Sequence, residues 1–310
     1  MPEWLLFILA LIPATFRLTV PILLASIGEV ISERAGVMNI GIEGYMLMGA
    51  LFGYIGSLWS GSPLVGVMLA VIVGGLLSLI HAFLSVTCGV EQIISGIGLW
   101  IFSDGFTGFI NRTFVIKGSS IAPTAKGFGK LNIPMLSEIP VVGPILFEQN
   151  AFFYASIFLA IAFNFILFRT NFGLKIRAVG EKPAAIMDAG VSVNLMRYIG
   201  ILICGAMGGL AGASLSLGIM DRFFEGMSSG KGFIALAIVV LGNWMPINTI
   251  WGSLLFAVML ALQLRLQALG VAFPYPFLLM LPYVLAIVAV AGVIKKANTP
   301  AALGEVYRAE

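Results

Sequence analysis

Four ionisable residues lie inside apolar stretches long enough to cross a bilayer, namely Arg17, Glu43, Asp104 and Arg265. Placing a charge at membrane depth is costly, so such residues usually pair with one another or line a polar path. Asp104 lies deepest in its stretch by sequence, which favours an internal ion pair with Arg17 or Arg265. The alternative is that its carboxylate faces a polar path through the protein.

A polar path would need further side chains that can hydrogen-bond a solute. The predicted path residues are Asn39, Glu43, Trp100, Asp104, Asn243 and Gln263, with Asn164 as a further amide. Trp100, Phe106 and Trp244 could stack on a flat solute, although aromatic residues near span ends more often form a belt at the membrane interface. The residue types therefore leave both interpretations open.

Other chemistry is poorly supported by the sequence. The stretch GMSSGKG resembles a phosphate-binding loop, but only three residues separate its glycines and Gly232 follows Lys231, whereas the Walker pattern needs four residues and a Ser or Thr. His81 is the only histidine, and Cys88 and Cys204 are the only cysteines. We therefore expect no catalytic residues, no metal site and no bound cofactor, and any ATP that drives this protein would bind another chain.

The composition places these residues in a lipid bilayer. The chain has 310 residues, of which 60% are hydrophobic and 10% charged, whereas about a quarter of the residues in soluble domains are charged. The net charge of +3 comes from basic residues in loops rather than in a stripe, which argues against a nucleic-acid partner. Because Met1-Pro2-Glu3 lacks a basic segment, the first apolar stretch is expected to stay in the membrane.

Apolar stretches of the required length predict an all-α polytopic protein with about nine transmembrane or re-entrant helices, in a range of about eight to ten. The predicted segments are 4–27, 37–58, 64–86, 93–110, 151–168, 198–219, 233–244, 250–269 and 277–294. Pro13 and Pro21 predict a kink or break in the first segment, and GEVISER, residues 28–34, predicts a polar turn after it. Segment 233–244 is short and is predicted to be re-entrant. We treat residues 1–310 as a single domain.

Glycines recur at four-residue spacing, as in Gly49 and Gly53 or Gly205 and Gly209. Such spacing lets helices approach closely in lipid and predicts a packed bundle. Two glycine-rich stretches, VMNIGIEGYMLMGAL and GMSSGKGFIALAIVVLGN, each lead from a polar into an apolar segment. They are candidates for corresponding parts of two internal repeats.

A basic loop at residues 169–197 separates two of the apolar segments. Its charged residues are Arg169, Lys175, Arg177, Lys182 and Arg197 against Glu181 and Asp188. Basic loops resist translocation, so this loop is predicted to be cytoplasmic, with the C-terminus, while the N-terminus and the long loop 111–149 are predicted outside. Residues 183–189 have room for about two helical turns. They predict a short helix presented to a cytosolic partner, unless the loop only fixes topology.

Three stretches together resemble the permease subunits of ABC-type importers for ribose, branched-chain amino acids and nucleosides. They are SERAGVMNIGIEGYMLMGA, GLKIRAVGEKPAAIMDAGVSV and GKGFIALAIVVLGNWMP, and the first resembles the nucleoside branch most. The resemblance implies inward transport of a small polar solute, with a nucleoside favoured over a ribose-type sugar or a branched-chain amino acid. An ion-coupled secondary transporter that uses Glu43 and Asp104 is the rival from another class.

The resemblance also implies that the second stretch forms a coupling helix that docks on an ATPase subunit. The implied coupling residues are Gly180, Glu181, Lys182, Pro183, Ala184, Ala185, Asp188, Ala189 and Gly190. Family members often carry Asn where this chain has Lys182, so the chain departs from the family pattern at that position. Implied partners are an ATP-binding subunit that holds ATP and Mg²⁺, a second permease subunit, and an extracytoplasmic solute-binding lipoprotein or periplasmic protein, at the cytoplasmic (inner) membrane.

Overall fold

A computed structural model describes residues 3–116, 123–131, 137, 143–269, 275–293 and 298–307. The helices are α1 Glu3–Arg34, α2 Ile42–Ser60, α3 Pro63–Ala82, α4 Gln92–Ile110, α5 Ala151–Arg169, α6 Asn171–Glu181, α7 Pro183–Asp188, α8 Val193–Gly218, α9 Lys231–Leu241, α10 Pro246–Ala268 and α11 Tyr275–Val293. Single π-helical turns cover Phe83–Thr87, Asn111–Ile116 and Gly143–Phe147. Within these ranges the chain forms no strand, only an isolated bridge between Lys130 and Asn150.

Every predicted apolar segment contains a helix, so the all-α polytopic prediction is confirmed. In the described part of the chain, six helices are long and apolar enough to cross a membrane. They cover Leu9–Arg34, Pro63–Thr87, Gln92–Ile116, Ala151–Arg169, Val193–Gly218 and Pro246–Ala268. At 11 residues, α9 is about 16 Å long and too short to span the hydrocarbon core.

The first helix is continuous, which excludes a break at Pro13 or Pro21 and the predicted polar turn at residues 28–34. It is one helix of 32 residues, so neither Pro13 nor Pro21 breaks it, because neighbouring side chains and helices re-satisfy the freed backbone groups in a membrane bundle. Residues 28–34 continue the helix and do not form a polar turn. Glu29 and Glu33 lie one turn apart on a buried face, where they accept hydrogen bonds from other segments.

The central packing involves α1, α2, α3 and α8. Glycines allow these helices to touch backbone to backbone, since a Cβ at Gly49 would overlap the backbone of Gly209 and a Cβ at Gly74 would overlap that of Gly205. A Cβ at Gly212 would likewise overlap the carbonyl oxygen of Met46. The predicted glycine-mediated bundle is therefore confirmed.

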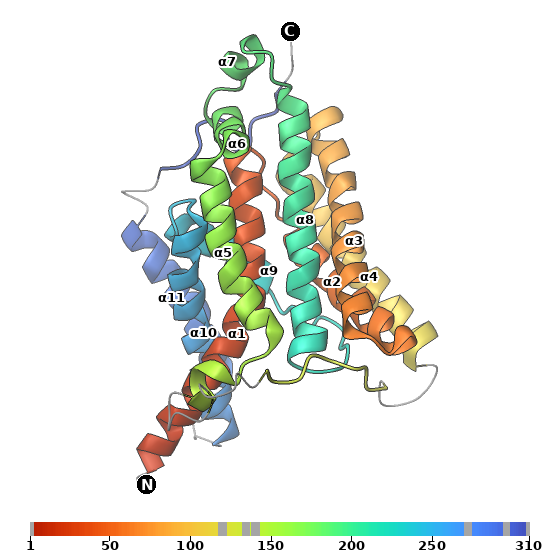
Figure 1. The fold of residues 1–310 in the computed structure, drawn as a ribbon, viewed down its shortest axis with the longest axis vertical. Helices are drawn as coiled ribbons and strands as arrows, with labels where there is room; N and C mark the ends of the chain where they lie inside the picture. Colours follow the sequence, from red (N-terminus) through yellow and green to blue (C-terminus); the bar gives the residue numbers. More distant parts are fainter. Residues whose placement is uncertain are drawn as a thin grey trace.

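The basic loop 169–197 folds into α6 and α7 at one end of the molecule, which we call the α7 end. The first turns of α1 and the segment 123–131 lie at the opposite end (Figure 1). The short helix predicted at 183–189 is confirmed as α7, Pro183–Asp188. The sequence did not predict α6, whose buried side is formed by Gly173, Ile176, Val179 and Gly180.

Candidate functional site

The α7 end presents a short, unburied helix. Pro183 occupies the first turn of α7, where its missing N–H costs nothing, and none of its six residues is buried. Gly190 has a φ of +80°, which turns the chain back toward α8 and suits a residue without a Cβ. Small exposed side chains at Ala184 and Ala185 leave α7 open to close approach by another surface.

The implied coupling residues divide into two groups. Glu181, Lys182, Ala184, Ala185, Asp188, Ala189 and Gly190 are exposed, and Pro183 is partly exposed. Gly180 is buried instead, and a Cβ there would overlap the carbonyl oxygen of Arg34. Gly180 is therefore a packing joint between α6 and the end of α1, and not part of the exposed surface.

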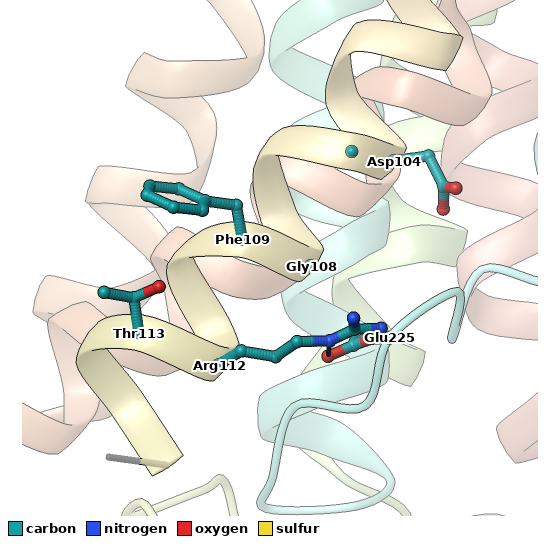
Figure 2. Close-up of a pocket in the computed structure, with 7 residues that line it drawn as sticks. Asp104, Gly108, Phe109, Arg112, Thr113 and Glu225 are labelled. Atoms are coloured by element: carbon teal, nitrogen blue, oxygen red, sulfur yellow. Dashed lines mark hydrogen bonds and ion pairs between the residues drawn. The ribbon is translucent and has the colours of Figure 1, made fainter. Parts of the chain in front are cut away.

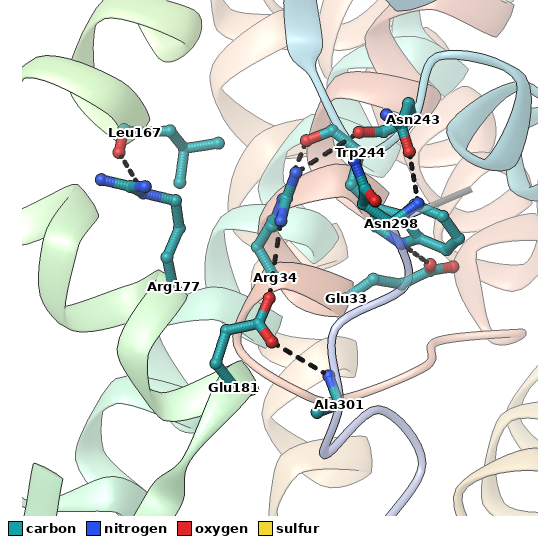
Figure 3. A network of polar contacts seen from close by, with 9 residues as sticks. All are labelled: Glu33, Arg34, Leu167, Arg177, Glu181, Asn243, Trp244, Asn298 and Ala301. Atoms are coloured by element: carbon teal, nitrogen blue, oxygen red, sulfur yellow. Dashed lines mark hydrogen bonds and ion pairs between the residues drawn. The ribbon is translucent and has the colours of Figure 1, made fainter. Parts of the chain in front are cut away.

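Arg34 connects this joint to the loop between α9 and α10 (Figure 3). Its Nε donates to the carbonyl oxygen of Trp244 at 2.9 Å, and its Nη2 donates to that of Asn243 at 3.3 Å. Its Nη1 lies 3.9 Å from Oε1 of Glu181. Asn243 and Trp244 both have positive φ, +53° and +54°, a conformation that residues with a Cβ adopt at a cost.

The same junction holds the indole of Trp244. This side chain is buried and its Nε1 donates to Glu33 of α1. Trp244 is thus not free to stack on a solute. Its neighbour Asn243, a predicted path residue, accepts a 2.7 Å hydrogen bond through Oδ1 from the backbone N–H of Asn298.

Glu43 links the beginnings of α2 and α9 in the interior. It lies in the first turn of α2, and its carboxylate accepts hydrogen bonds from Ser228 Oγ at 2.6 Å, Gly230 N at 2.7 Å and Gly232 N at 2.6 Å. These donors lie at and just before the beginning of α9, so one buried carboxylate satisfies two N–H groups at the N-terminus of that helix. The two glycine-rich stretches singled out in the sequence therefore meet at Glu43, an arrangement typical of discontinuous transporter helices.

Two further predicted path residues lie around the start of α9. Trp100 of α4 packs edge-on against Phe233, with ring centroids 5.1 Å apart. Gln263 of α10 lines a cavity of about 230 Å³ together with Ser229 and Lys231. The ammonium group of Lys231 donates to the carbonyl oxygen of Ser228 at 3.0 Å.

Asn39 belongs to a buried polar cluster that precedes α2. Its backbone N–H donates to Glu29 Oε1 at 2.8 Å, and its Oδ1 accepts from the Tyr45 hydroxyl at 2.9 Å. The thiol of Cys204 donates to Glu29 Oε2 at 3.2 Å. Sequence reasoning missed Glu29 and Glu33, although their spacing of four residues places them on one helix face.

Asp104 lines an open cavity of about 400 Å³ between α4 and the α8–α9 loop (Figure 2). Figure 2 shows Arg112, in the turn that continues α4, reaching Glu225 of the α8–α9 loop. Its Nε donates to Oε1 at 2.8 Å and its Nη2 donates to Oε2. The hydrogen bond from Arg112 lowers the pKa of Glu225, and a weaker one from Asn111 acts in the same direction. In the same loop, partial burial raises the pKa of Asp221.

The predicted ion pair of Asp104 is not formed within the described residues. Arg17 donates to the carbonyl oxygen of Pro13, and the guanidinium of Arg265 lies 5.3 Å from the ring centroid of Phe7. The side chain of Asp104 is exposed, and such a group inside a membrane helix faces protein or water rather than lipid. The ion-pair interpretation is therefore wrong for the isolated chain.

These features define a multi-pass membrane protein in which the beginnings of α2 and α9 meet in the interior, as the ends of discontinuous helices do in solute transporters. The chain belongs to the family described as "branched-chain amino acid transport system / permease component", whose model matches residues 11–290. Members of this family are transport proteins rather than enzymes.

Individual relatives match over most of the chain. A Bacillus subtilis protein named guanosine ABC transporter permease protein NupQ is 39% identical, covering 96% of each chain. A Lactococcus lactis protein named nucleoside ABC transporter permease protein NupC is 35% identical, covering 93% of each. A Haloferax volcanii relative, TsgC13, is 37% identical over 86% of this chain and 80% of its own, and is provisionally named a glucose ABC transporter permease protein. No solved structure matches the chain significantly.

Proposed function

We propose that this chain is the permease subunit of an ATP-driven importer that carries a nucleoside across the cytoplasmic membrane. The observation that carries the proposal is the match along almost the whole chain to permeases named for guanosine and nucleosides. The exposed helix α7 supports it, because a partner that hydrolyses ATP needs a surface on which to dock. The chain itself offers no phosphate-binding loop of the Walker type.

The proposed assembly contains a second permease subunit, ATP-binding subunits and a solute-binding protein on the outer side. ATP and Mg²⁺ bind the ATP-binding subunits, and α7 is the coupling helix that contacts one of them. Small residues at Ala184 and Ala185 let the α7 backbone come close to a groove in the partner. Displacement of α7 then changes which side of the membrane the solute path opens to.

In this proposal the solute path runs past the exposed face of α4. Asp104 supplies a carboxylate that can accept two N–H or O–H groups from a polar solute. Exchange of Asp104 for Asn keeps its size but turns one acceptor oxygen into a donor. Asp104→Asn should therefore raise the solute concentration needed for half-maximal uptake, while Thr113→Ser, in the same cavity, should not.

The docking role of α7 is tested in the complete complex in proteoliposomes. Ala185→Glu adds a large charged side chain to an exposed position and should lower solute-stimulated ATP hydrolysis about tenfold, equivalent to about 1.4 kcal/mol. Ala185→Ser keeps the residue small and should leave it unchanged. Gly190 is a poorer test site, because its positive φ would strain any larger residue. Equal stimulated hydrolysis in the Glu and Ser variants would refute the docking role.

The transported solute is tested by competition. Uptake of labelled guanosine should be reduced by unlabelled guanosine or other nucleosides and unaffected by glucose, ribose or leucine. The match to TsgC13 makes a sugar the second candidate. Competition by glucose without competition by nucleosides would favour it. Uptake by the chain alone in liposomes, driven only by an ion gradient, would replace the ATP-driven proposal with an ion-coupled one.

A further inference from the structure

The segment 298–307, after α11, folds back across the α7 end of the molecule, and we call it the C-terminal strap. It has no regular secondary structure beyond a turn. It nevertheless contacts the α9–α10 loop, the end of α6, the α1–α2 connection, α8 and α7. A segment that only trailed from the last helix would not engage so many separate parts of the chain.

The first half of the strap uses its backbone N–H groups. Asn298 N donates to Asn243 Oδ1 at 2.7 Å, and Ala302 N donates to the carbonyl oxygen of Gly180 at 2.8 Å. Figure 3 shows the strap running between Asn243 and Glu181, whose carboxylate lies 3.4 Å from the N–H of Ala301. Gly304 N reaches the carbonyl oxygen of Gly36 at 3.2 Å.

The second half of the strap lies against α8 and α7. Arg197 of α8 is buried and donates through Nη1 to the carbonyl oxygen of Glu305 at 2.8 Å. The ring of Tyr307 lies 6.0 Å from the same guanidinium. The hydroxyl group of Tyr307 lies 3.1 Å from Sδ of Met187 in α7.

Burial alone does little to fix the position of α7. None of its residues is buried, and of its side chains only Ile186 packs against the main core. Among the described residues, α7 also lies against its chain neighbours α6 and α8, and the Tyr307–Met187 contact joins it to the strap. The strap thus joins the most exposed helix of the molecule to the loop that follows α9.

We infer that the C-terminal strap positions α7 and transmits its displacement to the α9–α10 loop. This inference rests on the proposed function, because it assumes that α7 docks on an ATP-hydrolysing partner. The strap supplies a continuous set of contacts from Met187 through Tyr307 and Ala302 to Asn298 and Asn243. At Asn243 it meets the loop that also binds Arg34 and Glu33.

Point variants test the strap better than a deletion does. Deletion of the strap would leave the buried Arg197 without its hydrogen-bond acceptor, and an unpaired buried charge destabilises the fold. Tyr307→Ala removes the contact with Met187 and the ring beside Arg197, but it keeps the hydrogen bond from Arg197 to the carbonyl oxygen of Glu305. Asn243→Gly removes the acceptor for Asn298 but tolerates the positive φ of that position.

In the complete complex, each variant should lower solute-stimulated ATP hydrolysis and solute uptake about fivefold or more, a typical coupling effect. Thr299→Ala is the matched control, because this strap residue is exposed and its change should have no effect. For Tyr307→Ala, ATP hydrolysis without solute and co-purification of the ATP-binding subunit should be unchanged. Normal stimulation in both Tyr307→Ala and Asn243→Gly would overturn the inference.

A cross-link provides a rescue that general instability would not show. Met187→Cys with Tyr307→Cys, made in a Cys88→Ser background because the exposed Cys88 lines the same cavity as Tyr307, removes the native contact. Uptake should fall, and a short bifunctional maleimide that joins the two cysteines should restore it. The inference would be contradicted if the double-cysteine variant took up solute normally before cross-linking, or if its uptake stayed low after cross-linking.

The two proposals fail in different ways. If Ala185→Glu leaves stimulated hydrolysis intact, then α7 is not the docking helix and the proposed function is wrong. If Ala185→Glu abolishes stimulation while the strap variants behave like Thr299→Ala, then α7 docks but the strap plays no part in coupling.

Discussion

Removal of the Glu43 carboxylate should loosen the start of α9. The carboxylate accepts from Ser228, Gly230 and Gly232 in the interior of the bundle. The Ser228 hydroxyl can rotate to another acceptor, but the two backbone N–H groups cannot. Each buried donor left unsatisfied costs about 1–3 kcal/mol, and the negative charge at the helix N-terminus contributes about 0.3–1 kcal/mol more.

Glu43→Ala should therefore lower the free energy of unfolding by about 4 kcal/mol. Glu43→Gln keeps one acceptor oxygen but turns an amide NH₂ toward an N–H donor. We therefore expect it to lower the free energy of unfolding by about 2 kcal/mol. The assay is reversible unfolding by sodium dodecyl sulfate in mixed micelles, followed by circular dichroism. Glu91→Gln is the matched control, since Glu91 is exposed and caps no N–H of α4. Equal stability of the two Gln variants would refute this account of α9.

Two further outcomes follow from the packing and from the outer ion pair. Gly49→Ala should destabilise the bundle by about 1–3 kcal/mol in the same unfolding assay, because its Cβ would overlap Gly209, whereas Gly98→Ala, with open space around it, should not. Arg112 lowers the pKa of Glu225 in the folded state. The stability that this pair contributes is therefore fully present above the pKa of Glu225 in the unfolded chain, and it is lost as the pH falls through the pKa of Glu225 in the folded protein. The stability difference between wild type and Glu225→Gln, measured by thermal unfolding, should be constant from neutral pH down to about 4.5 and shrink below it; a difference that grew on acidification would contradict this.

The sequence was informative wherever side-chain type reports on local structure. Apolar length located the helices, Pro183 with the small residues after it located α7, and glycine spacing predicted the close contacts of α2 and α8. The second apolar segment was predicted at 37–58, whereas α2 begins at Ile42, and the sequence did not show what Glu43 binds. Its partners lie more than 180 residues away, and no local pattern encodes such a pairing.

Two other features could not be predicted from the sequence, for different physical reasons. The stretch 28–34 has the composition of a turn, but a polar helix face that meets buried donors has the same composition, so Glu29 and Glu33 were assigned to a turn. The C-terminal strap binds mainly through its backbone N–H groups. Since almost every residue carries a backbone N–H group, the residue types of the strap did not indicate where it would bind.

Carboxylates from other segments form polar contacts near both ends of α9. Because α9 is too short to reach both membrane surfaces, the backbone N–H groups at its beginning lie in the interior, where water does not compensate them. Glu43 satisfies the donors at its beginning, and Glu33 holds the indole of Trp244 just beyond its end. Both carboxylates come from the region around the α1–α2 connection, so the position of α9 depends on that region.

This arrangement accounts for most of the acidic groups in the apolar part of the chain. Glu33 and Glu43 hold the ends of α9, and Glu29 holds the segment before α2 through Asn39. Asp104 differs, because its carboxylate forms no ion pair or hydrogen bond with another described residue and opens onto a cavity. A charge kept at such a position without a structural partner needs protein or solute opposite it. Asp104 is therefore the residue at which a solute path past α4 is best sought.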